Sequence, residues 1–456
     1  MVKKFAKGID AVSDHYVLLL LALTLMGLTI IGVGDTTTVS MLGMVLCAAG
    51  IFQKPGRVDL QILLPMLVYL LIGAASSYAA AGNVTHTYTA THTIYPVLYL
   101  LMASLEEKEL LWLRRLSVLW VSYVAANGVV QFLLKALDGT AGRLGGMMSN
   151  PNSMGIFLVV GWFGLTAWAP GPEESGPLPA LLRRLEPLLL TALALTLSMG
   201  SFLALAVGMA VRAAGWVKAS GWRGAAEESS RMLAKAALCV GAGILMYFTG
   251  RNTSVPWLCL GLALWLLALM CLWEKFDRFL LAYRWFPWVM CGGGFAVALA
   301  AVAVRPSAAA TFAERLEMMR NGLTYLPVNP LLGVGPYQWR LLNMADGDTY
   351  FNTWHIHNIP IHIGVELGLI AMTAAVLIIL RTLSKRGRNV AGFAAFLLHN
   401  LMDTSFFYMG TTTAVLFTVG EPERDGRQFG TIVFRAAFVI FGLLFIYYYI
   451  FGPRLQ

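Results

Sequence analysis

Long apolar runs follow one another along almost the whole chain, separated by short polar links. One bilayer crossing needs about twenty predominantly apolar residues, and a window of this length identifies about fourteen runs. They lie near residues 16–33, 37–52, 60–80, 92–105, 116–136, 153–169, 187–198, 200–216, 232–249, 255–273, 286–304, 358–380, 390–419 and 430–451. We therefore expect an all-α polytopic membrane protein, in which residues 1–456 form a single membrane domain with about 12–14 transmembrane helices.

The composition agrees with this fold class and excludes several others. Hydrophobic residues make up 58% of the chain and charged residues 12%, whereas about a quarter of the residues in a soluble domain are charged. A soluble enzyme, a disordered protein and a nucleic-acid-binding module are thereby excluded, so no nucleic-acid partner is expected. The five cysteines lie in or beside apolar runs without a CxxC pair, which makes a zinc site or a disulfide framework unexpected.

The basic residues predict the topology. The net charge of +9 comes from lysines and arginines that flank the apolar runs, as in the cytoplasmic loops of membrane proteins. Lys3, Lys4 and Lys7 precede a first run without a signal-peptide cleavage site, so an uncleaved first helix with a cytoplasmic N-terminus is expected. The same rule divides residues 187–216 into two helices at Ser198–Ser201. It also predicts a cytoplasmic C-terminus.

One extracytoplasmic segment, residues 305–357, is far longer than the other links and has little apolar character. It contains a partly amphipathic helical stretch over 312–323, a turn-rich stretch over 327–336 and a short helix candidate over 337–344. Long loops inside compact folds are usually functional, so we expect part of the functional site in this large extracytoplasmic loop.

The strongest polar cluster follows this loop, at His357–Gly368. Pro360 suits the first turn of a helix, with Asn358 as its N-cap. In that case Asn358, His362 and Glu366 recur every fourth residue along one helix face. Polar groups in a membrane helix normally face a cavity or the bundle interior, which makes Asn358 and Glu366 candidate substrate-binding residues. The alternative is that His362 and Glu366 hydrogen-bond each other and hold two helices together.

His357 lies just ahead of this helix, at the expected extracytoplasmic surface of the membrane. The partial positive charge of a helix N-terminus keeps a nearby imidazole neutral, and a neutral imidazole can act as a general base near pH 7. His357 is therefore a candidate catalytic residue, and His355 is a weaker candidate of the same kind. Two alternatives stay open: the helix end holds a phosphate, or His357 is a solvated loop residue.

Arginines on the expected outer side form a second group. The positive-inside rule predicts few of them, yet Arg143 lies in one outer loop near Asn152, and the long loop carries Arg315, Arg320 and Arg340. Guanidinium groups bind phosphate oxygens in pairs, so these residues are candidate contacts for an anionic ligand. Each arginine could instead pair with an acidic neighbour or with lipid headgroups.

Four short segments, taken in order, resemble the bacterial O-antigen ligase and O-antigen polymerase family of polytopic membrane glycosyltransferases. They are Arg143 with Asn150-Pro151-Asn152, the segment Ser198–Leu205, Arg315 with Asn329–Gly335, and His357-Asn358 with Glu366–Gly368. All of them fall within residues 116–419, and the long outer loop before the last helices also fits the family.

The resemblance implies a C-type membrane glycosyltransferase fold and a donor glycan carried on undecaprenyl diphosphate. It implies transfer of that glycan to an acceptor hydroxyl at the outer face of the cytoplasmic membrane. The acceptor would be a glycolipid such as lipid A–core, another lipid-linked glycan repeat, or a protein serine. Arg315 would contact the diphosphate, and His357 would be the base for the acceptor hydroxyl. Inversion at the anomeric carbon is expected.

The resemblance also implies chemistry without a metal, and no cofactor is expected. Asp346-Gly347-Asp348 is similar to a metal-binding Asp-x-Asp pattern, but Asp-Gly is a common turn, and we favour the turn. The chain departs from the family at Met199, where members commonly have arginine after the serine of this segment. In the family that arginine is an expected phosphate contact, so Arg143, Arg320 or Arg340 would have to make the contact here.

Two other classes of function are compatible with a polytopic chain. A secondary transporter or flippase of a lipid-linked or anionic substrate would use the polar residues as its pathway, although the sequence has no visible inverted repeat. A non-catalytic membrane sensor or assembly scaffold ranks last, because no soluble output domain is evident.

Overall fold

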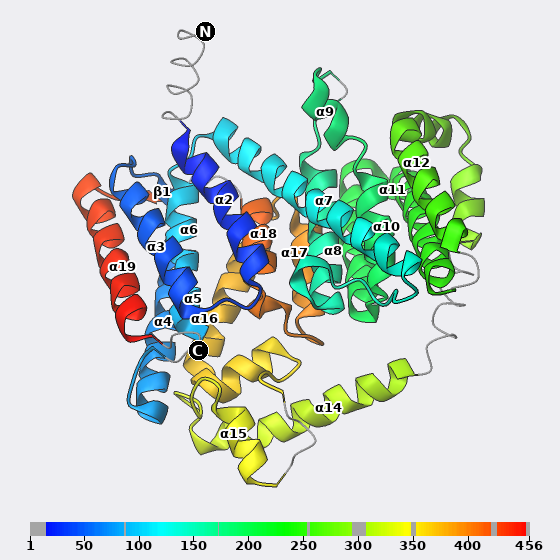
Figure 1. Ribbon diagram of the computed structural model, residues 1–456. Coiled ribbons are helices and arrows are strands. Elements are labelled where there is room, and N and C mark those ends of the chain that lie inside the picture. Colours follow the sequence, from blue (N-terminus) through cyan, green and yellow to red (C-terminus); the bar gives the residue numbers. More distant parts are fainter. Residues whose placement is uncertain are drawn as a thin grey trace. The chain divides into compact units, whose positions relative to one another are not determined.

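The computed structural model describes residues 15–85, 88–171, 173–252, 256–293, 307–347, 353–420 and 426–452. Over these residues the regular secondary structure is helical, apart from one pair of two-residue antiparallel strands (Figure 1). The all-α fold class expected from the sequence is confirmed.

The chain divides into two compact units. Unit 1 comprises Met1–Arg114, Glu314–Gly387 and Asn400–Gln456, and unit 2 comprises Arg115–Ala313 and Arg388–His399. The single membrane domain expected over residues 1–456 stays a prediction. The segments of the family resemblance are shared between the units.

The elements of unit 1 are α2 (Tyr16–Ile31), α3 (Thr36–Ile51), β1 (Arg57–Val58), α4 (Leu60–Ala81), α5 (Tyr88–His92), α6 (Ile94–Ala103), η2 (Leu326–Val328), α15 (Gln338–Ala345), α16 (Ile359–Ser384), η3 (Ser405–Phe407), α18 (Met409–Val419), β2 (Arg427–Gln428) and α19 (Thr431–Phe451). Those of unit 2 are η1 (Gly146–Met148), α8 (Pro151–Trp168), α9 (Pro177–Leu182), α10 (Glu186–Thr196), α11 (Met199–Arg251), α12 (Pro256–Ala282) and α17 (Val390–His399). Two helices, α7 (Glu107–Leu137) and α14 (Ser307–Tyr325), contribute residues to both units.

Six helices in the described ranges are long and apolar enough to cross a membrane, namely α4, α7, α11, α12, α16 and α19. Four shorter apolar helices accompany them, namely α2, α3, α17 and α18. The chain therefore has the helices of a polytopic membrane protein. The predicted run at 286–304 falls largely on residues 294–306, which lie outside the described part, so the total of 12–14 spans stays a prediction.

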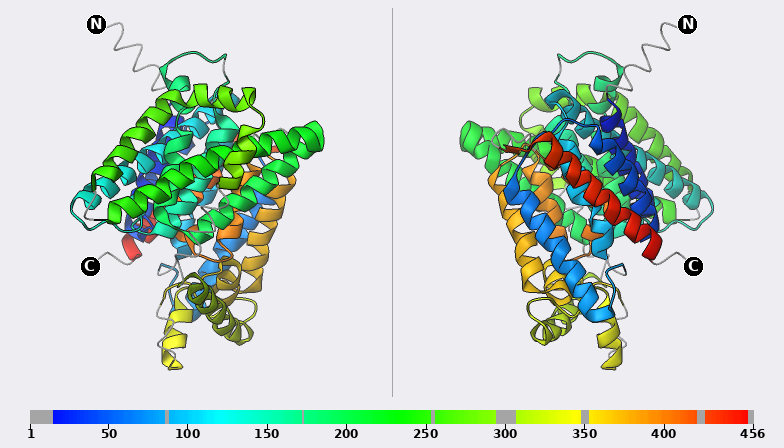
Figure 2. Two further views of the ribbon diagram at one scale, coloured as in Figure 1. Left: turned by 90° about the vertical axis from the view of Figure 1, so that its right-hand side faces the viewer. Right: turned by 90° about the vertical axis from the view of Figure 1, so that its left-hand side faces the viewer.

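Unit 1 is built from antiparallel helix pairs. In one pair, α3 packs along α19 (Figures 1 and 2). The phenyl rings of Phe445 and Phe438 lie where side chains at Gly43 and Gly50 would otherwise stand. A Cβ atom at either glycine would lie 2.4–2.5 Å from the ring, so these small residues allow the close approach.

In the second pair, α4 packs along α16. At one end, the Asp59 carboxylate accepts hydrogen bonds from Arg381 Nε (2.6 Å) and Lys385 Nζ (2.9 Å). At the other end, the Ser76 hydroxyl donates to the backbone carbonyl of Glu366 (2.9 Å). These contacts fix the register of the two helices from both ends.

Replacing Asp59 with asparagine should destabilise unit 1. Burial alone would raise the pKa of Asp59, but hydrogen bonds from Lys385 and Arg381 outweigh burial and hold the pKa below its ordinary 3.8. A depressed carboxylate pKa contributes stability that is present above the unfolded-state pKa and is lost as the pH falls below it. Because the ion pairs are partly exposed, we expect Asp59→Asn to lower the free energy of unfolding by about 1–2 kcal/mol at pH 7. The difference should vanish at acid pH.

Thermal unfolding in detergent between neutral and acid pH measures this effect. Asp35→Asn is the matched control, since Asp35 also caps a helix by accepting from Thr38 N–H (2.8 Å), and asparagine caps equally well. Equal behaviour of the two variants at neutral pH would contradict a role for the ion pairs.

The described ends of the chain lie at opposite ends of unit 1. The Tyr16 hydroxyl donates to the Ala49 carbonyl (3.1 Å) and accepts from the Gln53 amide (2.7 Å), so α2 begins beside the end of α3. Gly452 lies beside Thr36, so α19 ends beside the beginning of α3 (Figure 1). The sequence prediction that both termini are cytoplasmic stays a prediction.

The structure differs from the sequence prediction at residues 390–419, which the sequence predicts as one run. The structure divides them into α17 and α18, joined by a turn that contains η3. α18 begins beside the end of α2, where the Met409 N–H donates to the Gly32 carbonyl (2.9 Å). It ends at Gly420, whose carbonyl accepts from Arg114 near the beginning of α7.

Unit 2 confirms the division of residues 187–216. Leu197 adopts the left-handed conformation (φ 45°) after α10, and Ser198 caps α11 by accepting from the Ser201 N–H (3.3 Å). α11 then continues to Arg251 through a break at Gly221, where φ is 71°. Two predicted runs, 200–216 and 232–249, therefore lie on this one interrupted element.

Candidate functional site

The beginning of α16 is organised as the sequence predicts. The Asn358 side chain accepts from the Ile361 N–H (3.0 Å), and Pro360 lies in the first turn. The Asn358 amide also donates to the Leu401 carbonyl (3.1 Å), and the Ile359 N–H donates to the Asn400 carbonyl (2.9 Å). Asn358 thus joins the start of α16 to the turn that follows α17.

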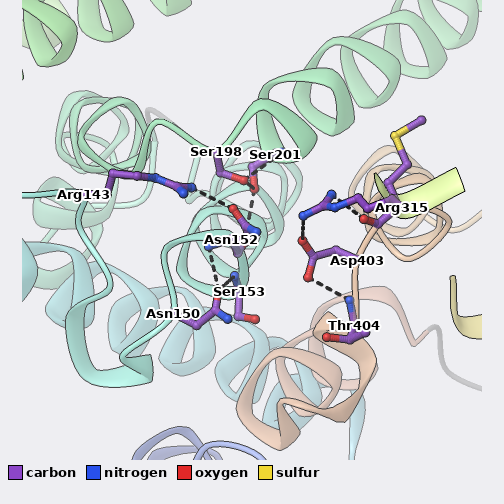
Figure 3. Close-up of polar contacts among 10 residues, drawn as sticks. Arg143, Asn150, Asn152, Ser153, Ser198, Ser201, Arg315, Asp403 and Thr404 are labelled. Carbon is purple, nitrogen blue, oxygen red and sulfur yellow. Dashed lines mark hydrogen bonds and ion pairs between the residues drawn. The ribbon is translucent and has the colours of Figure 1, made fainter. Parts of the chain in front are cut away.

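Arg315 reaches the same turn from α14. Its guanidinium donates to the Met402 carbonyl and forms an ion pair with Asp403 (3.0 Å), whose other oxygen accepts from the Thr404 N–H (2.8 Å) (Figure 3). The side chain of Asp403 is 4% exposed and that of Arg315 is 17% exposed. A guanidinium has five N–H donors, so this pairing leaves part of its hydrogen-bonding capacity for a ligand.

The sequence analysis did not select Asp403. It lies inside the apolar run 390–419, far from the motifs of the long loop. One signal could have found it, because Asp403 is the acidic residue of that run, and an ionisable residue in an apolar segment is a functional candidate by default.

His357 has a buried, unsatisfied ring nitrogen. Its Nδ1 has no hydrogen-bond partner among the described residues. Burial lowers the pKa of His357 below its ordinary value; Asp403 and Glu314 act against this shift and Arg315 adds to it. The imidazole is therefore neutral at pH 7, and a neutral nitrogen without a partner can accept a proton.

The lowered pKa of His357 predicts the pH dependence of any reaction in which it is the base. Protonation removes the base, and burial moves that protonation below the ordinary 6.5 of histidine. We therefore expect kcat/KM to hold its plateau at pH 6.5 and to fall only at more acid pH. A pH profile of kcat/KM for the wild-type protein tests this expectation. An acid limb centred above 6.5 would contradict it.

His355 is enclosed by aromatic rings. Its ring centroid lies 4.0 Å from that of Phe407 and 5.0 Å from that of His362. Burial lowers the pKa of His355 to about 3, with smaller contributions from His357 and His92. With this lowered pKa His355 is also neutral at pH 7. Its Nε2 is buried and has no partner among the described residues.

Glu366 has a structural role in the long loop. Its carboxylate accepts from the backbone N–H groups of Tyr337 (2.9 Å) and Trp339 (3.3 Å) at the start of α15. His362 lies 3.3 Å from the same carboxylate, and both side chains are fully buried. The predicted stripe of Asn358, His362 and Glu366 is therefore present. Its contacts favour anchoring of the loop over substrate binding by Glu366.

The segment Asn329–Gly335 docks into a break in α16. Gly368 has a φ of 81°, which interrupts the helix, and the Leu369 N–H donates to the Pro330 carbonyl (2.8 Å). The Val334 N–H donates to the Val365 carbonyl (2.9 Å). The Asn-Pro-Leu-Leu-Gly-Val-Gly segment of the resemblance is thus a backbone clasp on α16.

The other predicted residues of the loop lie apart from this turn. Arg320 is exposed on α14. The Arg340 guanidinium lies over the Trp354 ring, 3.8 Å from its centroid. Asp346 accepts a hydrogen bond from the Tyr325 hydroxyl, while Asp348 lies outside the described residues. The described ranges contain no group of three or more His, Cys, Asp or Glu side chains arranged to hold a metal.

Unit 2 joins Arg143 and Asn152. The Arg143 guanidinium donates to the Asn152 side chain (2.8 Å) and to the Thr196 carbonyl (2.9 Å) (Figure 3). The Ser201 hydroxyl contacts the Asn152 carbonyl (3.3 Å) and the Ser198 hydroxyl (2.9 Å). Arg143 therefore bridges the loop before α8 and the break between α10 and α11.

The same break holds Met199 and a residue that the sequence analysis missed. The His399 ring, at the end of α17, is buried, and a Cβ atom at Gly200 would lie 3.4 Å from it. A histidine therefore lies at the helix start where the family resemblance implies an arginine. No sequence motif marks His399, because it lies inside the apolar run 390–419.

The fold and these side chains define a polytopic helical membrane protein with a half-buried histidine, a half-buried arginine and a buried aspartate near the start of α16. Comparisons with protein-family models, with curated proteins and with solved structures gave no significant match.

Proposed function

We propose that this protein transfers a glycan from an undecaprenyl-diphosphate donor to an acceptor hydroxyl at the outer face of the cytoplasmic membrane. It would do so as an enzyme of the O-antigen ligase or polymerase type, with a C-type fold. The observation that carries the proposal is the buried, unpartnered Nδ1 of neutral His357 beside the Arg315–Asp403 ion pair. A base and a fixed cation at one helix start are the two groups that this reaction needs.

The chemistry follows from those two groups. The acceptor oxygen forms a bond to the anomeric carbon while the bond from that carbon to the diphosphate oxygen breaks. His357 takes the hydroxyl proton, and undecaprenyl diphosphate leaves with the bonding electrons. Negative charge grows on the leaving diphosphate, and Arg315, already oriented by Asp403, stabilises it. A direct displacement of this kind inverts the anomeric carbon.

A second candidate function is transport of a lipid-linked or anionic substrate. It is favoured by the interruption between α17 and α18, because discontinuous helices are typical of substrate sites in secondary transporters. The polar groups of the turn at 400–404 would then form part of a pathway rather than a catalytic site.

One experiment separates the two functions. Purified protein in liposomes is given an undecaprenyl-diphosphate glycan and a set of acceptors: lipid A–core, a second lipid-linked glycan and a serine peptide. Release of undecaprenyl diphosphate together with a new glycosidic bond supports the transferase. Movement of the intact donor across the bilayer without bond cleavage supports the transporter and overturns the proposal.

A further inference from the structure

The helix α14 carries two separate apolar faces. One face belongs to the core of the loop, where Met318 and Tyr325 pack with Trp339, Ile356 and Val365. The other face is exposed, with Leu316 at 46% and Leu323 at 45% of their full accessibility. Phe312, one turn earlier, is 48% exposed.

The exposed residues form a stripe along the helix. Positions 312, 316 and 323 are separated by four and seven residues, so a helix with 3.6 residues per turn places them on one face. The same periodicity places Arg315 on one side of this stripe and Arg320 on the other. Apolar residues flanked by arginines are typical of a helix at the boundary between lipid headgroups and acyl chains.

The direction of α14 fits this boundary. Figures 1 and 2 show that α14 runs across the axis of α16, rather than along it. Since α16 is long and apolar enough to span the membrane, a helix that crosses its axis runs along the membrane surface. Within unit 1, the part of α14 from Glu314 onward lies at the end where α16 begins, as the bond from Arg315 to the 402–403 turn requires.

We propose that α14 is an interfacial helix whose stripe of Phe312, Leu316 and Leu323 lies in the acyl-chain boundary of the bilayer. The flanking arginines then lie at the depth of the lipid phosphates. The stripe is a membrane contact of the long loop, and it does not depend on the proposed transfer activity. If the transfer activity is also correct, the helix holds Arg315 at the depth at which the diphosphate of a lipid-linked donor enters.

Site-directed fluorescence tests the membrane contact directly. In a background with Cys271→Ser and Cys291→Ala, which removes the two cysteines that are not buried, single cysteines are introduced as Leu316→Cys, Leu323→Cys and Glu317→Cys. Each is labelled with bimane, and the full-length protein is placed in nanodiscs of brominated or ordinary phosphatidylcholine. Glu317 is the matched control, because it is exposed and points about 100° away from Leu316 on the helix.

The expected result is loss of bimane emission in brominated lipid at positions 316 and 323, and no loss at position 317. Iodide in the aqueous phase should quench the label at 317 and spare the other two. Quenching of all three labels by iodide alone would overturn the proposal. Protection of positions 316 and 323 from both quenchers would overturn it as well, since protein rather than lipid would then cover the stripe.

Discussion

Replacing His357 with alanine is expected to lower kcat/KM for glycan transfer by about 10²–10⁴-fold, the range that a general base contributes. The loss follows from the buried Nδ1, which has no partner among the described residues and so is free to accept the acceptor's proton. The substitution removes no hydrogen bond of that nitrogen, so the fold should be retained. The rate at which the purified variant releases undecaprenyl diphosphate, measured over a range of acceptor concentrations at saturating donor, gives kcat/KM for the acceptor.

His15→Ala is the matched control for this variant. His15 is a largely exposed histidine that pairs with Glu109 (2.7 Å), and it lies beside the start of α2. It should keep full turnover. Because donor binding by Arg315 does not need the imidazole, His357→Ala should keep the wild-type affinity for the lipid-linked donor. Wild-type turnover in a folded His357→Ala protein would remove His357 from the mechanism.

Replacing Gly333 with alanine is expected to be the most destabilising small substitution in the long loop. Gly333 has a φ of 71°, and an added Cβ atom would lie 2.3 Å from the backbone carbonyl of Glu366. The left-handed conformation costs a non-glycine residue about 1–2 kcal/mol, and overpacking against rigid backbone adds about 1–3 kcal/mol. The variant should therefore release the 329–335 clasp from α16 and lower the unfolding temperature.

Gly82→Ala separates conformational strain from the steric clash. Gly82 has a similar φ of 69° at the end of α4, but a Cβ atom there would meet nothing within 4 Å. Gly82→Ala should lower the free energy of unfolding only by the cost of the left-handed conformation, about 1–2 kcal/mol. Thermal unfolding of both variants in the same detergent gives the comparison. Equal shifts for the two glycines would mean that contact with Glu366 adds nothing to stability.

Local signals in the sequence predicted local structure well. The Asn358 cap with Pro360 is formed as expected, because an N-cap and a first-turn proline depend on neighbouring residues only. The break at Ser198–Ser201 is also confirmed, since short-range capping and the charge distribution both point to it. The role of Glu366 was only half predictable. Periodicity identified its helix face, but the two N–H groups that it holds lie 27 and 29 residues away in the chain.

Long-range pairing could not be predicted in the same way. Arg315 was selected as a cation for an anionic ligand, and its protein partner Asp403 lies 88 residues later inside an apolar run. The division of residues 390–419 was missed for a related reason. A hydropathy window averages over the polar turn between α17 and α18, so it reports the two helices as one run.

α2 begins beside the end of α3, and α19 ends beside the beginning of α3. This arrangement has a practical consequence for reporter proteins. If unit 1 crosses a bilayer along the axis of α3, a reporter joined ahead of Tyr16 and one joined after Gly452 would report from opposite sides of it. A fluorescent protein that matures only in a reducing environment would therefore be bright at one end of the chain and dark at the other. An enzyme such as alkaline phosphatase, which needs oxidising conditions, would show the reverse pattern.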